Sequence, residues 1–284
     1  MKAIVIFLLL SFQSLLLTAQ KPEIGIAQSM ENDSLLQASG YHYLVESISK
    51  CFSPRNVSDQ QFAERLQAIK KMKTKLYAVN VFIPGELKLV GPDVNEQAVL
   101  SYAEIVFQRC NAADVALIVW GSGGARRVPD GWDQKKAKEQ FVSIARKVSA
   151  IAKDYKIVLA LENLNSTETN FMTTLSEALE IVQQVDHPNF RLCADIYHML
   201  KENEQPAIIE QAGKYLVHCD LAEKENRTAP GISGDDFRGY LKALKKIKYS
   251  GKIILECRWD NLALQAAPAR QYLQVQIDEV FNQK

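Results

Sequence analysis

The segment Ile253–Trp259, IILECRW, runs three aliphatic residues directly into a glutamate. An ionised carboxylate at the end of a buried strand is costly unless it is paired, so its position calls for an explanation. The same pattern recurs in three earlier apolar runs, KIVLALE at 156–162, FRLCAD at 190–195 and YLVHCDLA at 215–222, which carry Glu162, Asp195 and the pair His218 and Asp220. Whether these strand ends meet decides both the fold and the site.

Apolar runs of strand length alternate with longer amphipathic stretches along most of the chain. The runs are nearly continuous in apolar residues, which is typical of parallel strands covered on both faces. They lie at 23–28, 43–49, 75–83, 115–121, 156–162, 190–195, 215–222 and 252–256. This alternation predicts an α/β fold, a single (β/α)8 TIM barrel, whose usual size is about 250 residues. A doubly wound open sheet is the alternative, but the segment after the first run, GIAQSMEND, lacks the Gly-rich phosphate loop of that fold.

Helical periodicity fills several of the intervals between these runs. Segments 58–72, 133–154, 173–185 and 235–249 repeat apolar residues at helical spacing. Ser58 is a candidate N-cap for the first of them. Thr174 and Glu177 form a capping-box signature at the start of the third.

The first 20 residues, MKAIVIFLLLSFQSLLLTAQ, have the features of a secretory signal peptide cut near Ala19. Lys2 gives a basic start and Ile4–Leu10 an apolar run. A membrane anchor is the alternative, but polar residues interrupt the run and it is short against the roughly 20 residues of a span. We expect 1–20 to be a signal peptide, 21–284 to be one barrel domain, and the mature protein to be periplasmic without a stable membrane anchor.

The net charge and the cysteines indicate which partners and which cysteine-based sites to expect. The formal net charge is +1, which favours neither nucleic acid nor an anionic membrane surface as a partner. The five cysteines are scattered, odd in number and without CxxC spacing, which argues against a structural zinc site or a disulfide framework. A homo-oligomer is compatible with the composition.

Polar residues at strand ends are expected to converge, because a TIM barrel carries its active site at the C-terminal ends of its strands. Four consecutive strands end on such residues: Glu162, Asp195, the pair His218 and Asp220, and Glu256. The period of two places His218 and Asp220 on one face of their strand and Cys219 on the other. Crowded carboxylates repel one another, and a divalent cation is the simplest counter-charge. Mn²⁺ or Mg²⁺ suits this oxygen-rich set, with Zn²⁺ or Co²⁺ as alternatives; solvated loop ends are the other interpretation.

Four segments resemble the xylose isomerase-like barrels, a superfamily of sugar isomerases and epimerases, ketose 3-epimerases, inosose dehydratases and AP-endonucleases. They are LALENLNSTETN at 159–170, LCADIYHM at 192–199, HCDLAEKENRTAPG at 218–231 and GDDFRGYLKALKKIKYSGKIILE at 234–256. The resemblance runs from about Glu23 to the C-terminus. Its order and spacing are specific for the superfamily and weak for any one substrate.

The resemblance implies roles for three carboxylates. Glu162 and Glu256 match residues that bind the metal and exchange protons with substrate, and Asp195 matches a further carboxylate ligand. The family usually shows His-x-His at the seventh strand, where this chain has His218 followed by Cys and Asp220. Either Asp220 or His218 is then the ligand, or the metal is bound more weakly. A carboxylate there can still bind Mn²⁺ or Mg²⁺.

The resemblance and the strand-end positions also supply candidate substrate contacts. His198 matches a histidine that touches substrate or a second metal, Glu168 a substrate-binding glutamate, and Arg227 an arginine that holds a substrate oxygen. Trp120 and Trp259 follow the fourth and eighth strands, where an aromatic ring could stack on a sugar or wall the pocket. A solvated loop position is the alternative for both tryptophans.

These residues predict a divalent-metal-dependent sugar isomerase or epimerase, an enzyme acting on an unphosphorylated sugar or keto-sugar. Proton abstraction next to a carbonyl would give an enediolate, with Glu162 and Glu256 as the acid–base pair. Export argues against phosphorylated metabolites. The alternatives are a 3-keto-glycoside lyase or hydratase that uses the same enolate, and a non-catalytic periplasmic carbohydrate-binding barrel. Nuclease activity is disfavoured, because the chain has only four histidines for a multi-metal site.

Overall fold

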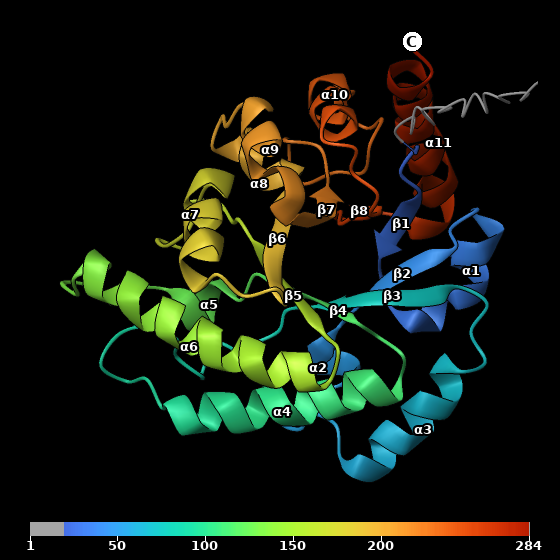
Figure 1. Cartoon of the computed structure of the whole chain (residues 1–284). Helices are drawn as coiled ribbons and strands as arrows, with labels where there is room; N and C mark the ends of the chain where they lie inside the picture. Colours follow the sequence, from blue (N-terminus) through green and yellow to red (C-terminus); the bar gives the residue numbers. More distant parts are fainter. Residues whose placement is uncertain (1–19, 284) are drawn as a thin grey trace, which may run out of the picture.

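The apolar runs pair side by side, in parallel and in chain order, and the last pairs with the first (Figure 1). The computed structural model describes residues 20–283, so the expected signal peptide lies outside the described residues apart from Gln20. The strands are β1 Ile24–Ala27, β2 Tyr43–Ser47, β3 Lys75–Asn80, β4 Leu117–Trp120, β5 Val158–Glu162, β6 Phe190–Asp195, β7 Leu216–Leu221 and β8 Ile253–Leu255. The predicted (β/α)8 barrel is therefore confirmed.

Helices occupy the intervals between the strands and cover the outside of the barrel (Figure 1). They are α1 Asp33–Ala38, α2 Ile48–Cys51, α3 Asp59–Ile69, α4 Glu96–Ala112, α5 Gly123–Arg126, α6 Gln134–Asp154, α7 Leu175–Val185, α8 Ile196–Lys201, α9 Ala207–Ala212, α10 Arg238–Lys246 and α11 Leu262–Phe281, with 3₁₀ turns η1 Met30–Asn32 and η2 Gly213–Tyr215. All four predicted helices are present, as α3, α6, α7 and α10. Ser58 caps α3 and Thr174 caps α7, as predicted, and Thr174 forms the predicted capping box with Glu177. Ser58 forms a second capping box, with Gln61.

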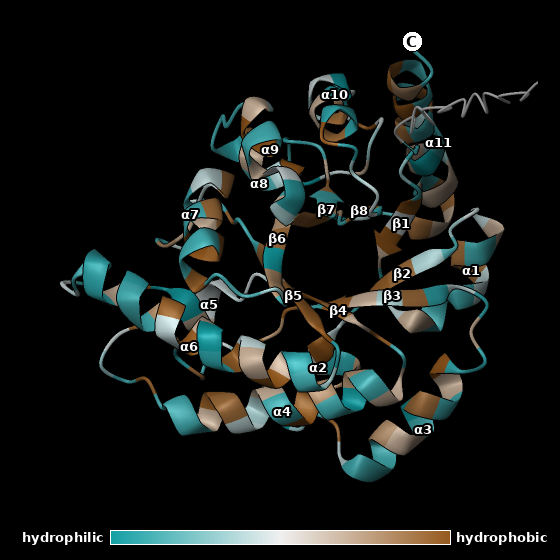
Figure 2. Cartoon of the chain, in the orientation of Figure 1, coloured by the Kyte–Doolittle hydropathy of each residue, from teal (hydrophilic) through white to brown (hydrophobic). Residues whose placement is uncertain are grey.

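Alternating side chains of each strand face two different cores. A small set points into the barrel: Val45, Ala78, Leu117, Val119, Ala160, Cys193 and Ile254. The other face packs against the apolar sides of the helices in a much larger cluster. Figure 2 shows largely brown strands surrounded by helices of mixed teal and brown. The inward parity of β5 continues from Ala160 to Glu162, and that of β8 from Ile254 to Glu256. The side chains of Glu162 and Glu256 therefore point into the barrel, like the apolar side chains two residues before them.

The register between β6 and β7 fixes two layers of polar residues. Asp195 is opposite Asp220, and two residues earlier Cys193 is opposite His218. An irregularity between Leu192 and Cys193 shifts the register there. Because parallel strands rise together, the Cys193–His218 layer lies one step deeper in the barrel than the Asp195–Asp220 layer.

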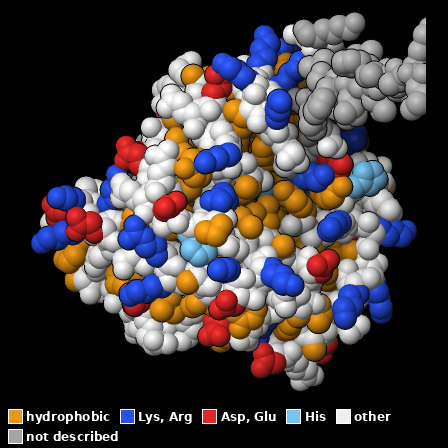
Figure 3. All heavy atoms as spheres, in the orientation of Figure 1, with side chains coloured by type: hydrophobic (Ala, Val, Ile, Leu, Met, Phe, Trp, Pro, Cys, Tyr) orange, Lys and Arg blue, Asp and Glu red, His pale blue; other side chains and the backbone are white. Residues whose placement is uncertain are grey.

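The outer surface carries interspersed charge. On the face drawn in Figure 3, Lys and Arg side chains are spread over the surface with Asp and Glu between them, in keeping with the net charge of +1. Within residues 20–283, no helix combines the length and apolarity that crossing a membrane requires.

Gly25 tests how tightly the barrel interior is filled. A Cβ at this position on β1 would lie 2.5 Å from Ile254 Cδ1 and 3.0 Å from the Tyr43 carbonyl oxygen. We therefore expect Gly25→Ala to lower the free energy of unfolding in urea by roughly 1–3 kcal/mol, the usual cost of overpacking. Gly239→Ala in α10 is the matched control, because its Cβ would meet only Pro206 Cγ, at 3.4 Å. A Gly25→Ala variant as stable as wild type would contradict this packing.

Candidate active site

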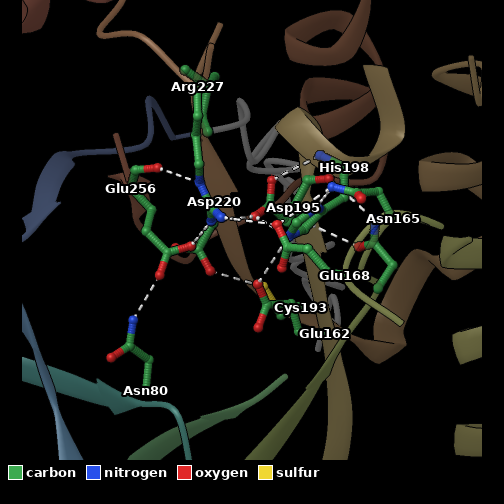
Figure 4. Close-up of polar contacts among 12 residues, drawn as sticks. Asn80, Glu162, Asn165, Glu168, Cys193, Asp195, His198, Asp220, Arg227 and Glu256 are labelled. Carbon is green, nitrogen blue, oxygen red and sulfur yellow. Dashed lines mark hydrogen bonds and ion pairs between the residues drawn. The ribbon is translucent and has the colours of Figure 1, made fainter. Parts of the chain in front are cut away.

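The inward strand ends gather four carboxylates at the C-terminal mouth of the barrel (Figure 4). Carboxylate oxygens of Glu162, Asp220 and Glu256 lie within 4.8 Å of one another. Glu162 also forms a group of the same tightness with Asp195 and His198. The predicted strand-end residues therefore meet around Glu162, on four neighbouring strands.

His218 lies in the deeper layer. Its Nε2 is 2.9 Å from Asp220 Oδ1, and its ring is stacked 5.9 Å from the ring of Tyr77. The ligand-type grouping that contains His218 joins it to Cys193 and Asp220. Of the two alternatives at the seventh strand, the geometry thus favours Asp220 as the residue that faces Glu162 and Glu256.

Crowding shifts the proton affinities of these carboxyl groups upward. Burial, with the neighbouring Glu256 and Asp195 carboxylates, raises the pKa of Glu162 well above its ordinary value. Burial, opposed by Arg227 and reinforced by Asp220, raises the pKa of Asp195 to about 6 and that of Glu256 to about 8. Carboxyl groups in this range can exchange protons near neutral pH, which is what general acid–base chemistry requires.

Arg227 is the cation that faces this cluster. Its Nη2 pairs with Glu256 Oε2 and lies 3.3 Å from Asp195 Oδ2, and its Nη1 lies 3.5 Å from Glu168 Oε1. Its guanidinium carbon lies 4.8 Å from the centre of the Tyr197 ring, a cation–π contact. Burial alone would lower the pKa of Arg227, but the surrounding carboxylates raise it overall. One guanidinium thus balances part of a larger negative charge.

A folded loop after β7 presents Arg227. Asn226 and Arg227 both adopt left-handed backbone, with φ of 55° and 57°. The loop folds around the buried Glu223 carboxylate. This carboxylate accepts hydrogen bonds from the backbone N–H groups of Gly231, Ser233, Gly234 and Asp235 and from the Thr228 hydroxyl. Despite the burial, which opposes it, these bonds lower the pKa of Glu223. Glu223 therefore holds the loop in the strained form that directs Arg227 inward.

His198 is a neutral, buried imidazole on α8. Burial, with the Arg227 charge, lowers its pKa to about 3. The Asn165 amide nitrogen lies 2.8 Å from Nδ1, an arrangement in which Nδ1 accepts and Nε2 carries the proton. Nε2 lies 3.3 Å from Asp195 Oδ2 and 3.8 Å from Glu162 Oε1. His198 thus faces the carboxylate cluster with a neutral ring.

A cavity of about 280 Å³ opens above the cluster. Its charged and polar side chains are Asn80, Glu162, Glu168, His198, Arg227 and Glu256, and the backbone of residues 121–124 forms part of its wall. Gly121 leaves room in this wall for the Glu162 carboxylate, because a Cβ there would displace Glu162 Oε2 from its present position. Asn80, at the end of β3, donates a hydrogen bond of 2.7 Å to Glu256 Oε1. The predicted residues Glu168, His198 and Arg227 all line this cavity.

The structure does not bring the two predicted tryptophans to the cavity. Trp120 faces the outer core, fully buried with its ring 5.1 Å from Phe82 and 5.5 Å from Phe141. The cause is strand parity, since Val119 and not Trp120 points into the barrel. Trp259 is half-buried against the outer core, and neither tryptophan is among the described residues that line the cavity.

Sequence reasoning missed several polar residues of the site: Asn80, Asn163, Asn165, Cys193, Tyr197 and Glu223. Asn80 ends the observed strand β3, but it lies inside the predicted run 75–83, so the strand-end pattern passes over it. Asn163 bonds the backbone of Asp195 in both directions, at 2.9 and 3.2 Å, and so couples the ends of β5 and β6. Whether an amide can make such bonds depends on the register between β5 and β6, and the local sequence carries no signal for that register.

The donor set fits a hard divalent cation. Glu162, Asp220 and Glu256 offer oxygens close enough to share one ion, and Asp195 adds a fourth carboxylate beside Glu162. His198 Nε2 carries the ring proton, so it faces this group as a hydrogen-bond donor and is not one of the ligands. Carboxylate-rich sites of this kind suit Mg²⁺ or Mn²⁺.

The raised pKa values predict how stability varies with pH when divalent cations are chelated. The ordinary pKa values of Asp195 and Glu256 are 3.8 and 4.5, against about 6 and about 8 in the folded protein. The folded protein therefore binds these two protons more tightly than the unfolded chain does. The contribution of Asp195 and Glu256 to the free energy of unfolding is largest below about pH 4, and it falls as pH rises through about 6 and about 8. We expect a loss of roughly 1–4 kcal/mol across this window in urea denaturation.

Glu256→Gln should flatten the upper part of this pH dependence, because the variant carries no titrating group at that position. Exposed Glu139→Gln on α6 is the matched control and should keep the wild-type slope. An identical slope in Glu256→Gln and wild type would show that Glu256 does not carry the raised pKa.

Known proteins share this architecture. The sequence matches the family model described as "Xylose isomerase-like TIM barrel" over residues 33–277. It is 31% identical over 174 residues to D-psicose 3-epimerase of Ruminiclostridium cellulolyticum, covering 58% of this chain and 57% of that protein. It is 34% identical over 123 residues to L-ribulose 3-epimerase of Methylomonas sp., covering 43% of each. The chain thus matches about half of the length of these curated relatives.

A solved structure agrees over a larger span. The crystal structure of D-psicose 3-epimerase with D-tagatose from Clostridium cellulolyticum H10 aligns with a TM-score of 0.74, over 91% of this chain and 98% of that one. Sequence identity in this alignment is 22%, so the likeness establishes the fold.

Proposed function

The chain belongs to the xylose isomerase-like TIM barrel family, and from this premise we propose that it is a sugar isomerase or epimerase, with a 3-epimerase of ketoses as the leading form. The observation that carries the proposal is the convergence of Glu162 and Glu256 with raised proton affinity at the floor of one cavity. The names of the relatives, D-psicose 3-epimerase and L-ribulose 3-epimerase, support a ketose as the substrate class.

Glu162 and Glu256 are the proposed proton-transfer pair. They rise from β5 and from the end of β8, which are separated by β6 and β7 around the barrel, so they can approach a bound sugar from different sides. One carboxylate removes the proton from the carbon next to the carbonyl, and the other carboxyl group delivers a proton to the opposite face. Asn80 and Arg227 hold the Glu256 carboxylate in place for this exchange.

A divalent cation completes the proposal. Glu162, Asp220 and Glu256 would hold it, with Asp195 beside them. When bound, the cation would supply positive charge next to the substrate carbonyl, which makes the neighbouring C–H more acidic. An oxygen-only set with Asp220 in place of a histidine favours Mg²⁺ or Mn²⁺ over Zn²⁺.

Three further residues would orient the sugar. Arg227 presents donors to a substrate oxygen, and Glu168, part-exposed at the mouth, can accept from a hydroxyl. His198 offers its neutral Nε2 toward the same cavity. The cavity is near the lower end of the range of small-molecule sites, about 300–1,000 Å³, which favours a monosaccharide. Its several carboxylates against one arginine favour an unphosphorylated sugar.

Solvent proton exchange tests the proton-transfer pair. Wild type in D₂O, supplied with Mn²⁺ and either D-psicose, D-tagatose or D-fructose, should release an epimer with deuterium at the inverted carbon. We expect Glu162→Gln and Glu256→Gln each to lower kcat for epimerisation by about 10²–10⁴-fold. Because each variant keeps one acid–base group, each should still exchange deuterium into one epimer of the pair, and the two variants should favour opposite epimers.

Glu139→Gln, an exposed substitution on α6, should retain wild-type exchange and turnover. Full epimerisation by Glu162→Gln or Glu256→Gln would remove that residue from the mechanism. With a 3-keto-glycoside as the substrate, a product with a new carbon–carbon double bond and a released aglycone would instead identify a lyase. Binding of a sugar without exchange would identify a carbohydrate-binding protein.

A further inference from the structure

A second set of ligand-type side chains lies directly below the carboxylates. Cys193 on β6 and His218 on β7 are opposite each other in the sheet register, and Asp220 stands one layer above them. Cys193 and His218 are fully buried and Asp220 is 3% exposed. The set offers one sulfur, one nitrogen and one oxygen ligand, whereas the carboxylates above it offer only oxygens.

The three side chains already converge on one point. Cys193 Sγ is 3.2 Å from Asp220 Oδ2, and His218 Nε2 is 2.9 Å from Asp220 Oδ1. One ligand atom from each lies within 4.8 Å of the other two. Bond lengths of about 2.3 Å to sulfur and about 2.0–2.2 Å to nitrogen and oxygen put the ligand atoms of a tetrahedral zinc ion roughly 3.2–3.6 Å apart. Small side-chain movements would therefore admit an ion.

The neighbourhood provides both an approach and a firm wall. Cys193 pairs in register with Glu162, which lines the cavity, so the set lies next to a residue of the cavity wall. On the other side, the His218 ring is stacked against Tyr77 with the planes 17° apart, which holds the imidazole edge toward Asp220. His218 Nδ1 is buried without a hydrogen-bond partner among the described residues, so Asp220 is the one polar contact described for this ring.

Ligand softness separates the two layers. Thiolate and imidazole select Zn²⁺, Co²⁺ and similar ions, whereas carboxylates suit Mg²⁺ and Mn²⁺. We propose that Cys193, His218 and Asp220 form a second cation site, selective for thiophilic divalent metals, that shares Asp220 with the carboxylate cluster. When the ion binds, the Cys193 thiol gives up its proton to solvent, since the thiolate is the ligand. The His218 ring proton moves from Nε2, which donates to Asp220 without the ion, to Nδ1, so that Nε2 can bind the ion. The site does not depend on the proposed sugar chemistry.

Cobalt spectroscopy tests the deeper site without reference to activity. Chelator-treated full-length protein is saturated with Mg²⁺ and then titrated with Co²⁺. We expect one Co²⁺ per chain, with the near-ultraviolet charge-transfer band of a thiolate-to-cobalt bond and the intense visible bands of tetrahedral coordination. Absence of the thiolate band in wild type would overturn the proposal and leave Cys193 and His218 as hydrogen-bond donors to Asp220.

Matched variants identify the thiol. Cys193→Ser should lose the charge-transfer band, and Cys219→Ser should keep it, because Cys219 faces the outer core on the same strand as His218. Retention of the band in Cys193→Ser would contradict the assignment. Glu162→Gln should keep the band, since Glu162 belongs to the upper cluster.

Competition for Asp220 provides a second readout. Excess Zn²⁺ should displace Mn²⁺ from wild type, seen as release of free Mn²⁺ by electron paramagnetic resonance, and should do so less in Cys193→Ser than in Cys219→Ser. Equal displacement in both variants would show that Zn²⁺ binds only among the carboxylates. Failure of every sugar to react would count against the proposed function and leave these two measurements unaffected.

Discussion

Repulsion between carboxylates that a closed barrel forces together is the interaction on which the site depends. Glu162, Asp195 and Glu256 are held by separate strands, so none can move away without breaking the parity that also buries the apolar interior below it. Arg227 offsets part of the charge. The negative charge that Arg227 does not offset raises the proton affinity of the carboxyl groups. The same excess of negative charge attracts a divalent cation, and the raised proton affinity permits proton exchange near neutral pH.

The two-residue repeat of the strands sorts functional from structural side chains. Inward positions carry Glu162, Cys193 and Asp220, while outward neighbours such as Trp120 and Cys219 enter the core between sheet and helices. Depth along a strand sorts the inward positions again, because oxygen ligands stand at the mouth and a sulfur and an imidazole stand one layer below. Two kinds of ligand chemistry thus follow from one register.

Much of this arrangement is predictable from the sequence, because apolar strands ending on acids and capping signals such as Ser58 and Thr174 are local patterns. Parity already separates His218 and Asp220 from Cys219. The direction of Trp120 is harder to predict from sequence, since it depends on where its strand begins and how that strand aligns with its neighbours. The depth of His218 depends on the register of β6 and β7 and on the irregularity before Cys193. The left-handed backbone at Arg227 depends on Glu223, whose partners lie up to 12 residues away.

Anomalous diffraction from a crystal grown with Mn²⁺ tests the central claim most directly. The account predicts a peak at the mouth of the barrel, within bonding distance of carboxylate oxygens of Glu162, Asp220 and Glu256. A map with no peak there, or with Mn²⁺ bound elsewhere while these carboxylates point apart, would contradict it.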